Sequence, residues 1–291
     1  KENTLSNKKN SVVNMEALGI AFQTGWQGGK NIPVGLVGAP GTGKTQIIEQ
    51  VADKCREEVI RTGKMKNFAF ENFTGPQTSP ESLEGISVPD LQEMVLDRLP
   101  LRRIRNLKEA DGGVFFFDEV SSTLPATGAA AMTGFQDGIF GDTKLSDTVA
   151  KAGAWNPPEC AAAGREFSAP EINRFLVLDW KLSFEDLADH LRGGPGAVAH
   201  IKFLPDNWEE DFSSGPIETV LAFLQQFPQH LNQIDSGVVT EAESGDSWAS
   251  QRAWTNVTRL LAASASLKPC QAGCPSINRL RPQQAPIRTE G

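Results

Sequence analysis

The sequence predicts an α/β protein in which a five-stranded parallel sheet with flanking helices is followed by a small all-α domain. Three observations lead to this fold class. Apolar runs typical of buried strands alternate with helical patterns as far as residue 182. One of these runs, residues 114–117, ends abruptly in two carboxylates. Beyond residue 183 only helical periodicity is evident.

The first predicted elements surround a glycine-rich segment. Residues 1–13 are mostly polar, which predicts a flexible N-terminal tail, and residues 15–27 predict a short helix. Residues 31–38, NIPVGLVG, form an apolar run rich in Val and Leu and predict a buried strand. Residues 45–55 then place Ile and Val at helical spacing. The order strand, glycine turn and helix is the context that a phosphate-binding loop requires.

The next segments continue the alternation. Residues 74–89 are rich in Gly, Pro and Ser and predict a loop, whereas residues 91–104 predict a helix that breaks at Pro100. A further helix with small residues on one face is predicted for residues 124–138. Four more strands are predicted at residues 67–73, 112–120, 148–155 and 174–180.

The C-terminal part predicts a separate domain. Helical periodicity is found in residues 183–193, 215–231 and 247–264. The last stretch is rich in Pro and Arg and has no clear period, which predicts a disordered or truncated end. The expected domains are the tail, a nucleotide-binding core, a helical lid and an irregular C-terminal tail, at residues 1–13, 14–182, 183–265 and 266–291.

The glycine-rich segment reads GAPGTGKT and has the pattern of a phosphate cradle. Its glycines permit a tight path in which backbone N–H groups point at phosphate oxygens. The Lys44 ammonium would neutralise the β- and γ-phosphates, and the following helix presents its positive end. The alternative is an ordinary turn that has this sequence by chance, and such a turn would need no strand before it and no helix after it. The residues expected to contact the nucleotide here are Gly38, Ala39, Pro40, Gly41, Thr42, Gly43, Lys44, Thr45 and Gln46.

Two carboxylates end the strand predicted for residues 112–120. Asp118 and Glu119 follow a buried run, and the carboxyl ends of parallel strands lie beside the phosphate loop. We expect Thr45 and Asp118 to hold Mg²⁺, and Glu119 to polarise the attacking water. The alternative is a pair of solvated carboxylates at a strand end.

Four segments occur in a recognisable order: GAPGTGKT, FFFDEVSSTLPATGAAAM, AWNPPECAAAGREFSAPEINRF and SWASQRAW. Together they resemble the MoxR-like branch of the AAA+ ATPases, over residues 14–262. The resemblance implies a P-loop AAA+ core with a helical lid, and it implies that the chain hydrolyses ATP with Mg²⁺.

The resemblance also implies roles for three further residues. Asn156 matches the polar sensor that positions the lytic water, although an Asn before Pro also suits a turn. Arg174 matches the arginine finger that reaches the γ-phosphate of a neighbouring subunit; the alternatives are an ion pair with Glu171, or Arg165 as the finger. Arg252 matches the second sensor on the lid, the alternative being a solvated helix arginine. Gln251 stands before it where family members usually have Pro.

As to partners, the resemblance implies a homo-oligomeric ring, expected to be a hexamer. It also implies chaperone-like remodelling or maturation of a client or adaptor protein, often one with a von Willebrand factor A domain. Residues 79–89 align with a loop that faces the pore of the ring, where Ile86 and Val88 are the only candidates to grip a substrate.

Two other functions are alternatives to the ring ATPase. An ATP-gated assembly switch or scaffold would bind nucleotide with negligible hydrolysis. A nucleic-acid motor is disfavoured by the net charge of −8 and by the lack of a basic stripe with interleaved aromatics. The aromatic residues expected to lie in the core are Trp155, Trp180, Trp248 and Trp254.

The remaining sequence features concern metal binding and cellular location. Cys270 and Cys274 could supply two metal ligands, but no second pair follows and none of His190, His200 and His230 lies at ligand spacing, so no zinc site is expected. There is no apolar run of membrane-spanning length and no signal-peptide pattern. With 4 cysteines in 291 residues, we expect a cytoplasmic protein.

Overall fold

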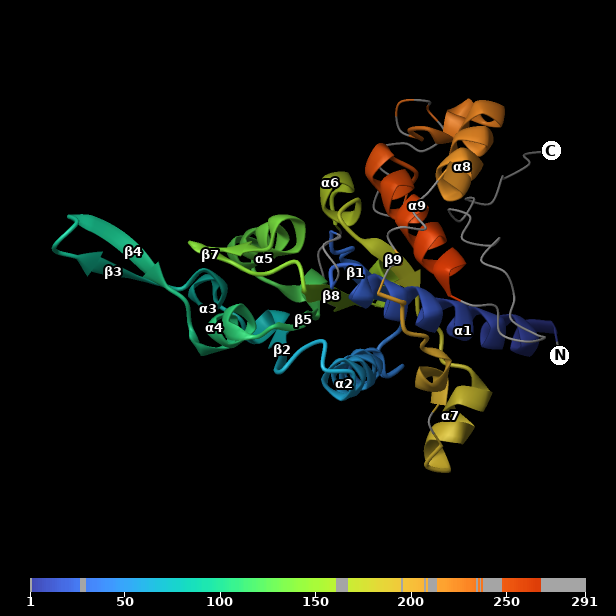
Figure 1. Cartoon of the computed structure of the whole chain (residues 1–291), viewed down its shortest axis with the longest axis horizontal. Helices are drawn as coiled ribbons and strands as arrows, with labels where there is room; N and C mark the ends of the chain where they lie inside the picture. The colour runs from blue at the N-terminus through green and yellow to red at the C-terminus, as the bar shows by residue number, and fades with distance from the viewer. Residues whose placement is uncertain are drawn as a thin grey trace. The chain divides into compact units, whose positions relative to one another are not determined.

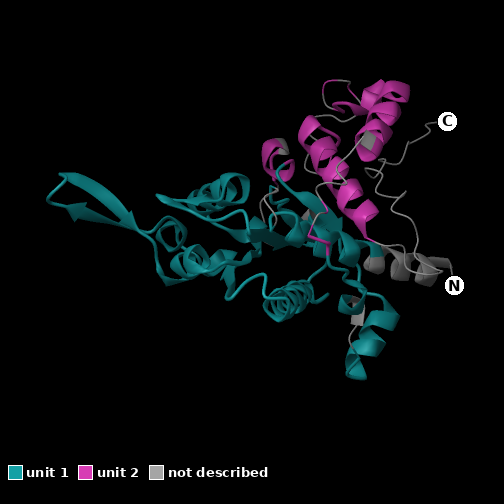
Figure 2. Ribbon diagram, viewed as in Figure 1, with its two compact units in different colours: residues 1–166, 174–203 teal, residues 167–173, 204–291 magenta. Residues whose placement is uncertain are grey.

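The computed structural model describes residues 2–26, 30–160, 167–194, 196–206, 208, 214–233, 235, 237 and 248–267. The chain divides into two compact units (Figure 2). The first comprises residues 1–166 and 174–203, and the second comprises residues 167–173 and 204–291. The boundary therefore differs from the one expected near residue 183, because residues 183–193 belong to the first unit.

A five-stranded sheet forms the centre of the first unit, with strand order β2-β5-β8-β1-β9. All four neighbouring pairs are parallel, which confirms the predicted fold class. Strands β5 and β8 are buried on both sides, and β5 therefore has a continuous apolar run in its sequence, whereas β8 contains one buried lysine, Lys151. The strands are β1 (Val34–Val37), β2 (Phe68–Thr74), β5 (Gly112–Asp118), β8 (Val149–Trp155) and β9 (Leu176–Asp179).

Helices on both sides of this sheet cover it. Figure 1 shows α2 and α5 on opposite sides of β5. Phe115 points to the α5 side, where its ring packs 5.5 Å from that of Phe135 and 4.7 Å from that of Phe140, measured between centroids. Phe116 points the other way and stacks on Phe70. The α-helices are α1 (Glu2–Gln23), α2 (Lys44–Arg61), α3 (Pro80–Glu84), α4 (Arg102–Glu109), α5 (Pro125–Asp137) and α7 (Phe184–Leu191).

Helix α1 corrects the expected N-terminal tail. It begins at Glu2, whereas residues 1–13 were predicted to be flexible. Met15, Leu18 and Phe22 are fully buried and fix the C-terminal half of the helix. Extending an established helix by one residue is much easier than nucleating a new one, so polar residues can continue it toward the N-terminus.

A second correction concerns residues 86–99. The loop predicted for residues 74–89 and the helix predicted from residue 91 are both wrong there, because these residues form an antiparallel hairpin of β3 (Ile86–Asp90) and β4 (Val95–Leu99). Asp90 Oδ1 accepts hydrogen bonds from the backbone N–H groups of Gln92 and Glu93, which closes the turn. Figure 1 shows this hairpin extending away from the sheet.

A smaller hairpin, also unpredicted, consists of β6 (Ile139–Phe140) and β7 (Thr143–Lys144). Its turn contains Gly141 at φ +58°, a conformation that favours glycine. Each of these strands has only 2 residues, which is too short to show an alternation of apolar and polar residues in the sequence.

The second unit is helical in its described part, with α6 (Ala169–Ile172), α8 (Ser214–Gln226) and α9 (Gln251–Ser266). Phe223 of α8 packs 5.5 Å from Trp254 of α9, between ring centroids, and the indole Nε1–H of Trp254 donates to the carbonyl of His230. The Ser250 side chain caps α9 by accepting from the N–H of Ala253. Among the described residues, no helix is both long enough and apolar enough to span a membrane.

Candidate functional site

Three neighbouring strands, β5, β8 and β1, end at one edge of the sheet. Since they are parallel, their C-terminal ends bring together Gly38, Asp118 and Asn156, which are far apart in the sequence. Open parallel sheets usually bind ligands at this edge. The phosphate loop and both predicted carboxylates therefore belong to one site.

The candidate phosphate loop (residues 38–43, hereafter the phosphate loop) connects β1 to α2 in the way its sequence predicts. Gly41 (φ +73°) and Gly43 (φ +80°) adopt the left-handed conformation that glycine tolerates best. The Thr42 hydroxyl donates to the Ala39 carbonyl, at 2.8 Å. Ala39, Pro40 and Gln46 are exposed.

Trp180, which lies outside the phosphate loop in the sequence, contacts the loop at two points. Its indole Nε1–H donates to the carbonyl of Thr42 at 2.9 Å, and a Cβ on Gly38 would lie only 2.4 Å from the Trp180 carbonyl oxygen. The side chain is almost completely buried, as expected for a core residue. Its contact with the loop was not predicted, because nothing in the local sequence links positions that lie 138 residues apart.

Lys44 occupies the centre of the site. Its Nζ donates to the carbonyls of Gly38 (2.7 Å) and Ala39 (3.0 Å) and to Asn156 Oδ1 (2.8 Å). Burial lowers the pKa of the ammonium, and the carboxylates of Asp118 and Glu119 oppose that shift. The contact with Asn156 brings the predicted sensor next to the predicted phosphate-binding lysine.

The two expected metal-binding residues also meet. Thr45 Oγ1 donates to Asp118 Oδ2 at 2.5 Å, and the other carboxylate oxygen, Oδ1, accepts from the N–H of Glu119. A hydroxyl beside a carboxylate is a hard oxygen donor set, which suits Mg²⁺ bound together with substrate phosphates. These residues therefore fit the ion that the sequence implies.

Glu119 has an unusual backbone. It is exposed and adopts φ 54° and ψ 42°, the left-handed region that non-glycine residues rarely enter. Such conformations persist only where the surroundings hold them, and they are concentrated at functional sites. The candidate catalytic carboxylate is thus presented on a turn that immediately follows β5.

Gly75 contacts this turn and was not singled out by its sequence. It follows β2, and a Cβ on it would lie 2.4 Å from the Glu119 carbonyl oxygen and 3.1 Å from a Thr123 methyl group. The Glu119 carbonyl belongs to the backbone, so it cannot move aside as the end of a flexible side chain could. A side chain at position 75 would therefore displace the turn that carries Glu119.

Gly75→Ala is therefore expected to lower kcat for ATP hydrolysis by roughly tenfold or more, since misplacement of a catalytic group by about 1 Å can cost two orders of magnitude. KM for ATP should change much less, because the atoms nearest to a Cβ at position 75 belong to Glu119 and Thr123 and not to the phosphate loop. Steady-state kinetics measure both constants. Gly215→Ala, at an exposed position with nothing near its Cβ and no left-handed backbone, is the matched control for a glycine substitution. Equal kcat values in the wild-type and Gly75→Ala proteins would show that Glu119 does not depend on this contact.

The two predicted arginines lie in different units. Arg174 is half-buried in the turn before β9, and Arg252 is exposed in the first turn of α9. Within the described residues neither guanidinium forms an ion pair or a hydrogen bond, so the ion pair of Arg174 with Glu171 is not observed. Their roles at the nucleotide remain predictions. Arg165 lies outside the described residues.

The described residues contain no group of three or more His, Cys, Asp or Glu side chains that could hold a metal ion. A magnesium site of the kind above, with one carboxylate and one hydroxyl, does not need such a group. Cys270 and Cys274 lie outside the described residues.

Comparisons with known proteins agree with this geometry. Residues 34–140 match the model of the family described as "ATPase family associated with various cellular activities (AAA)". The match contains the phosphate loop, Asp118 and Glu119, whereas Asn156, Arg174 and Arg252 lie outside it.

A solved structure described as that of a "putative ATPase" from Cytophaga hutchinsonii resembles the chain with a TM-score of 0.51. The similarity covers 90% of this chain and 79% of that chain at 16% sequence identity, so it concerns the fold alone. A search of curated proteins finds no significant match.

Proposed function

We propose that this chain is a MoxR-like AAA+ ATPase that hydrolyses ATP at the interface between subunits of a ring. The observation that carries the proposal is the convergence on Lys44. Its ammonium contacts the phosphate loop and Asn156, and the Thr45–Asp118 pair lies at the start of the same helix. The predicted phosphate-binding, metal-binding and water-positioning groups thus share one site.

The proposed chemistry is attack of water on the γ-phosphate. The Glu119 carboxylate accepts a proton from the water, and the Asn156 amide orients that water, because an amide can both donate and accept hydrogen bonds. Lys44 stabilises the charge on the phosphate oxygens. Thr45 and Asp118 would hold Mg²⁺, which supplies further charge neutralisation at the β- and γ-phosphates.

Arg174 would complete the site of a neighbouring subunit. Its guanidinium has no partner within the described residues, and an arginine supplied in trans can raise phosphoryl-transfer rates by about 10³–10⁵. The ring, a hexamer by resemblance, would drive chaperone-like remodelling or maturation of a client protein. A client with a von Willebrand factor A domain is part of the same proposal.

Mixing two inactive variants tests the shared site. Arg174→Ala and Glu119→Gln subunits should each be inactive alone, but mixed rings contain interfaces where an intact Glu119 faces an intact Arg174. At equal amounts about a quarter of the wild-type ATPase activity is expected, since random mixing leaves one interface in four complete. Specific activity of the wild-type protein should also rise with its concentration.

The matched control is Arg56→Ala, which removes an exposed arginine of α2 and should leave activity unchanged. If Arg174→Ala alone retains full activity, the shared site is wrong. If ATP binds but no phosphate appears at any protein concentration, the alternative function, an ATP-gated assembly switch, replaces the enzyme.

A further inference from the structure

The β3–β4 hairpin exposes large apolar side chains. Ile86, Val88, Val95 and Leu99 lie on one face of it, because they alternate along paired strands. Their exposed fractions are 52%, 38%, 50% and 56%. Asp90 and Asp97 share this face, opposite Val95 and Val88, so the apolar surface is continuous only at the stem, where Ile86 pairs with Leu99. Exposed apolar side chains that lie together in this way are typical of a binding site.

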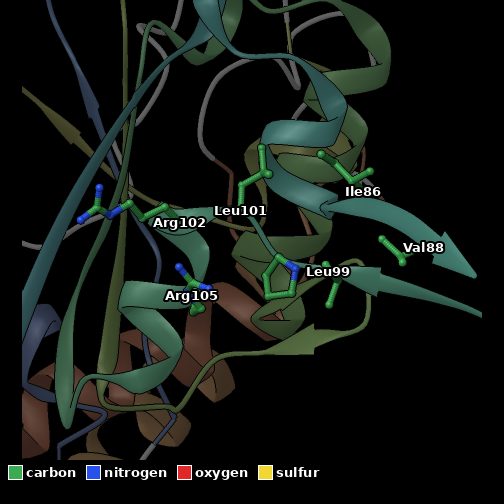
Figure 3. Close-up of a pocket in the computed structure, with 7 residues that line it drawn as sticks. Ile86, Val88, Leu99, Leu101, Arg102 and Arg105 are labelled. Atoms are coloured by element: carbon green, nitrogen blue, oxygen red, sulfur yellow. The ribbon is translucent and has the colours of Figure 1, made fainter. Parts of the chain in front are cut away.

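A groove lies at the stem of this hairpin (Figure 3). Its volume is about 410 Å³, which is within the range of pockets that take a few side chains. Apolar residues line most of it, and two arginines of α4 line the rest. The lining residues are Ile86, Val88, Leu99, Pro100, Leu101, Arg102 and Arg105.

The two arginines of the groove differ from their neighbours in having no counter-charge. Arg98 forms an ion pair with Glu84, and Arg103 lies 3.9 Å from a carboxylate oxygen of Glu71. Arg102 and Arg105 are exposed, and within the described residues neither guanidinium has an ion pair or a hydrogen bond. These unpaired positive charges are notable in a chain with a net charge of −8.

We propose that this groove, lined by the hairpin stem and α4, binds a peptide segment of a partner protein that carries both acidic and large apolar side chains. The apolar side chains would pack on Ile86, Val88 and Leu99. The carboxylates would pair with Arg102 and Arg105, whose guanidinium geometry suits bidentate contacts. Because both unpaired side chains are positive, an apolar segment with carboxylates should bind more tightly than a neutral apolar segment.

A nucleic acid fits this groove less well. Sequence-tolerant binding of single strands relies on aromatic side chains that stack on bases, and none lines the groove. The proposal names a partner for the remodelling role and to that extent rests on the proposed function. Peptide binding can be measured without nucleotide, so its failure would leave the ATPase unaffected, and failure of hydrolysis would leave the binding site standing.

Fluorescence anisotropy on the full chain tests the groove directly. The probe is a fluorescein-labelled peptide of alternating Asp and Leu residues. Two companion peptides carry Lys in place of Asp, or Ser in place of Leu. The Asp–Leu peptide is expected to bind at least about tenfold more tightly than either companion, since only it satisfies both the charges and the apolar surface.

Two sets of variants separate the contributions. Arg102→Gln together with Arg105→Gln should weaken binding of the Asp–Leu peptide about fivefold, as expected for two exposed ion pairs, and added salt should have less effect on this variant. Leu99→Ser should weaken binding by about threefold or more, because it removes a half-exposed apolar contact. Both substitutions are at exposed positions, and Arg56→Gln on α2 is the matched control that should bind like the wild type.

The proposal is overturned if the Lys–Leu peptide binds as tightly as the Asp–Leu peptide, or if both groove variants bind normally. It is also overturned if oligothymidylate displaces the peptide and depends on the same arginines, which would indicate a nucleic-acid site. Sedimentation velocity adds one more outcome. If Leu99→Ser dissociates an oligomer, the groove is an interface between copies of this chain and not a site for a partner peptide.

Discussion

Glu119→Gln is expected to reduce ATP hydrolysis by about 10²–10⁴-fold, the contribution typical of a positioned general base. The amide is nearly the same size as the carboxylate but cannot accept the proton of the attacking water. Because Glu119 is exposed and its hydrogen bonds to Asp118 and Ser122 are made by its backbone, the substitution should leave the fold intact. The measurement is phosphate release at saturating ATP.

ATP binding separates this effect from simple damage to the site. The Glu119→Gln protein should bind ATP about as tightly as the wild type, since Lys44 and the phosphate loop are unchanged. Glu57→Gln, at an exposed position of α2, is the matched control and should retain full activity. Hydrolysis within a few fold of the wild-type rate would identify Glu119 as a solvated carboxylate at a strand end and leave the catalytic base unassigned.

Lys44→Met is expected to weaken ATP binding by about 100-fold, because hydrogen bonds to charged groups are each worth about 1.5–3 kcal/mol. Met retains most of the length of the side chain but has no charge and no donor. Isothermal titration with ATP and Mg²⁺ would measure the change in affinity. Lys54→Met, at a half-buried position of the same helix, is the matched control.

Stability should be largely unaffected by Lys44→Met. The substitution removes an ammonium whose pKa burial already lowers, but it leaves the Gly38 carbonyl and Asn156 Oδ1 without this donor. These opposing effects should keep the free energy of unfolding within about 1 kcal/mol of the wild-type value. Unchanged ATP affinity in a folded Lys44→Met protein would contradict the assignment of residues 38–45 as the phosphate cradle.

Strand β5 of the central sheet could be predicted because it is buried on both faces. Val114, Phe115, Phe116 and Phe117 are fully buried, and such a run is apolar without interruption. The hairpin at residues 86–99 could not be predicted in the same way. Leu91, Met94 and Val95 have helix-like spacing, but the Asp90 side chain turns the chain back before a helix can form. Here turn chemistry overrides the local apolar pattern.

The phosphate loop illustrates what a short segment can specify by itself. Gly41 and Gly43 adopt positive φ angles that few other residues accept, and Lys44 follows at the start of a helix. Asp118 and Glu119 were recognisable for a similar reason, because carboxylates at the end of a buried strand must emerge at the sheet edge. These features depend on residues that are adjacent in the chain.

The sequence by itself determined the parallel sheet, the phosphate loop and the identity of the candidate catalytic groups, since backbone conformation and burial pattern are local properties. Only the tertiary structure decided how these groups are held. Asn156 lies 112 positions from the Lys44 that it contacts, and Trp180 lies 138 positions from the loop carbonyl that it binds. Gly75, which follows β2, lies so close to Glu119 that a side chain at this position would not fit. Such contacts arise from strand order and packing between distant segments, which a single sequence does not encode as a local pattern.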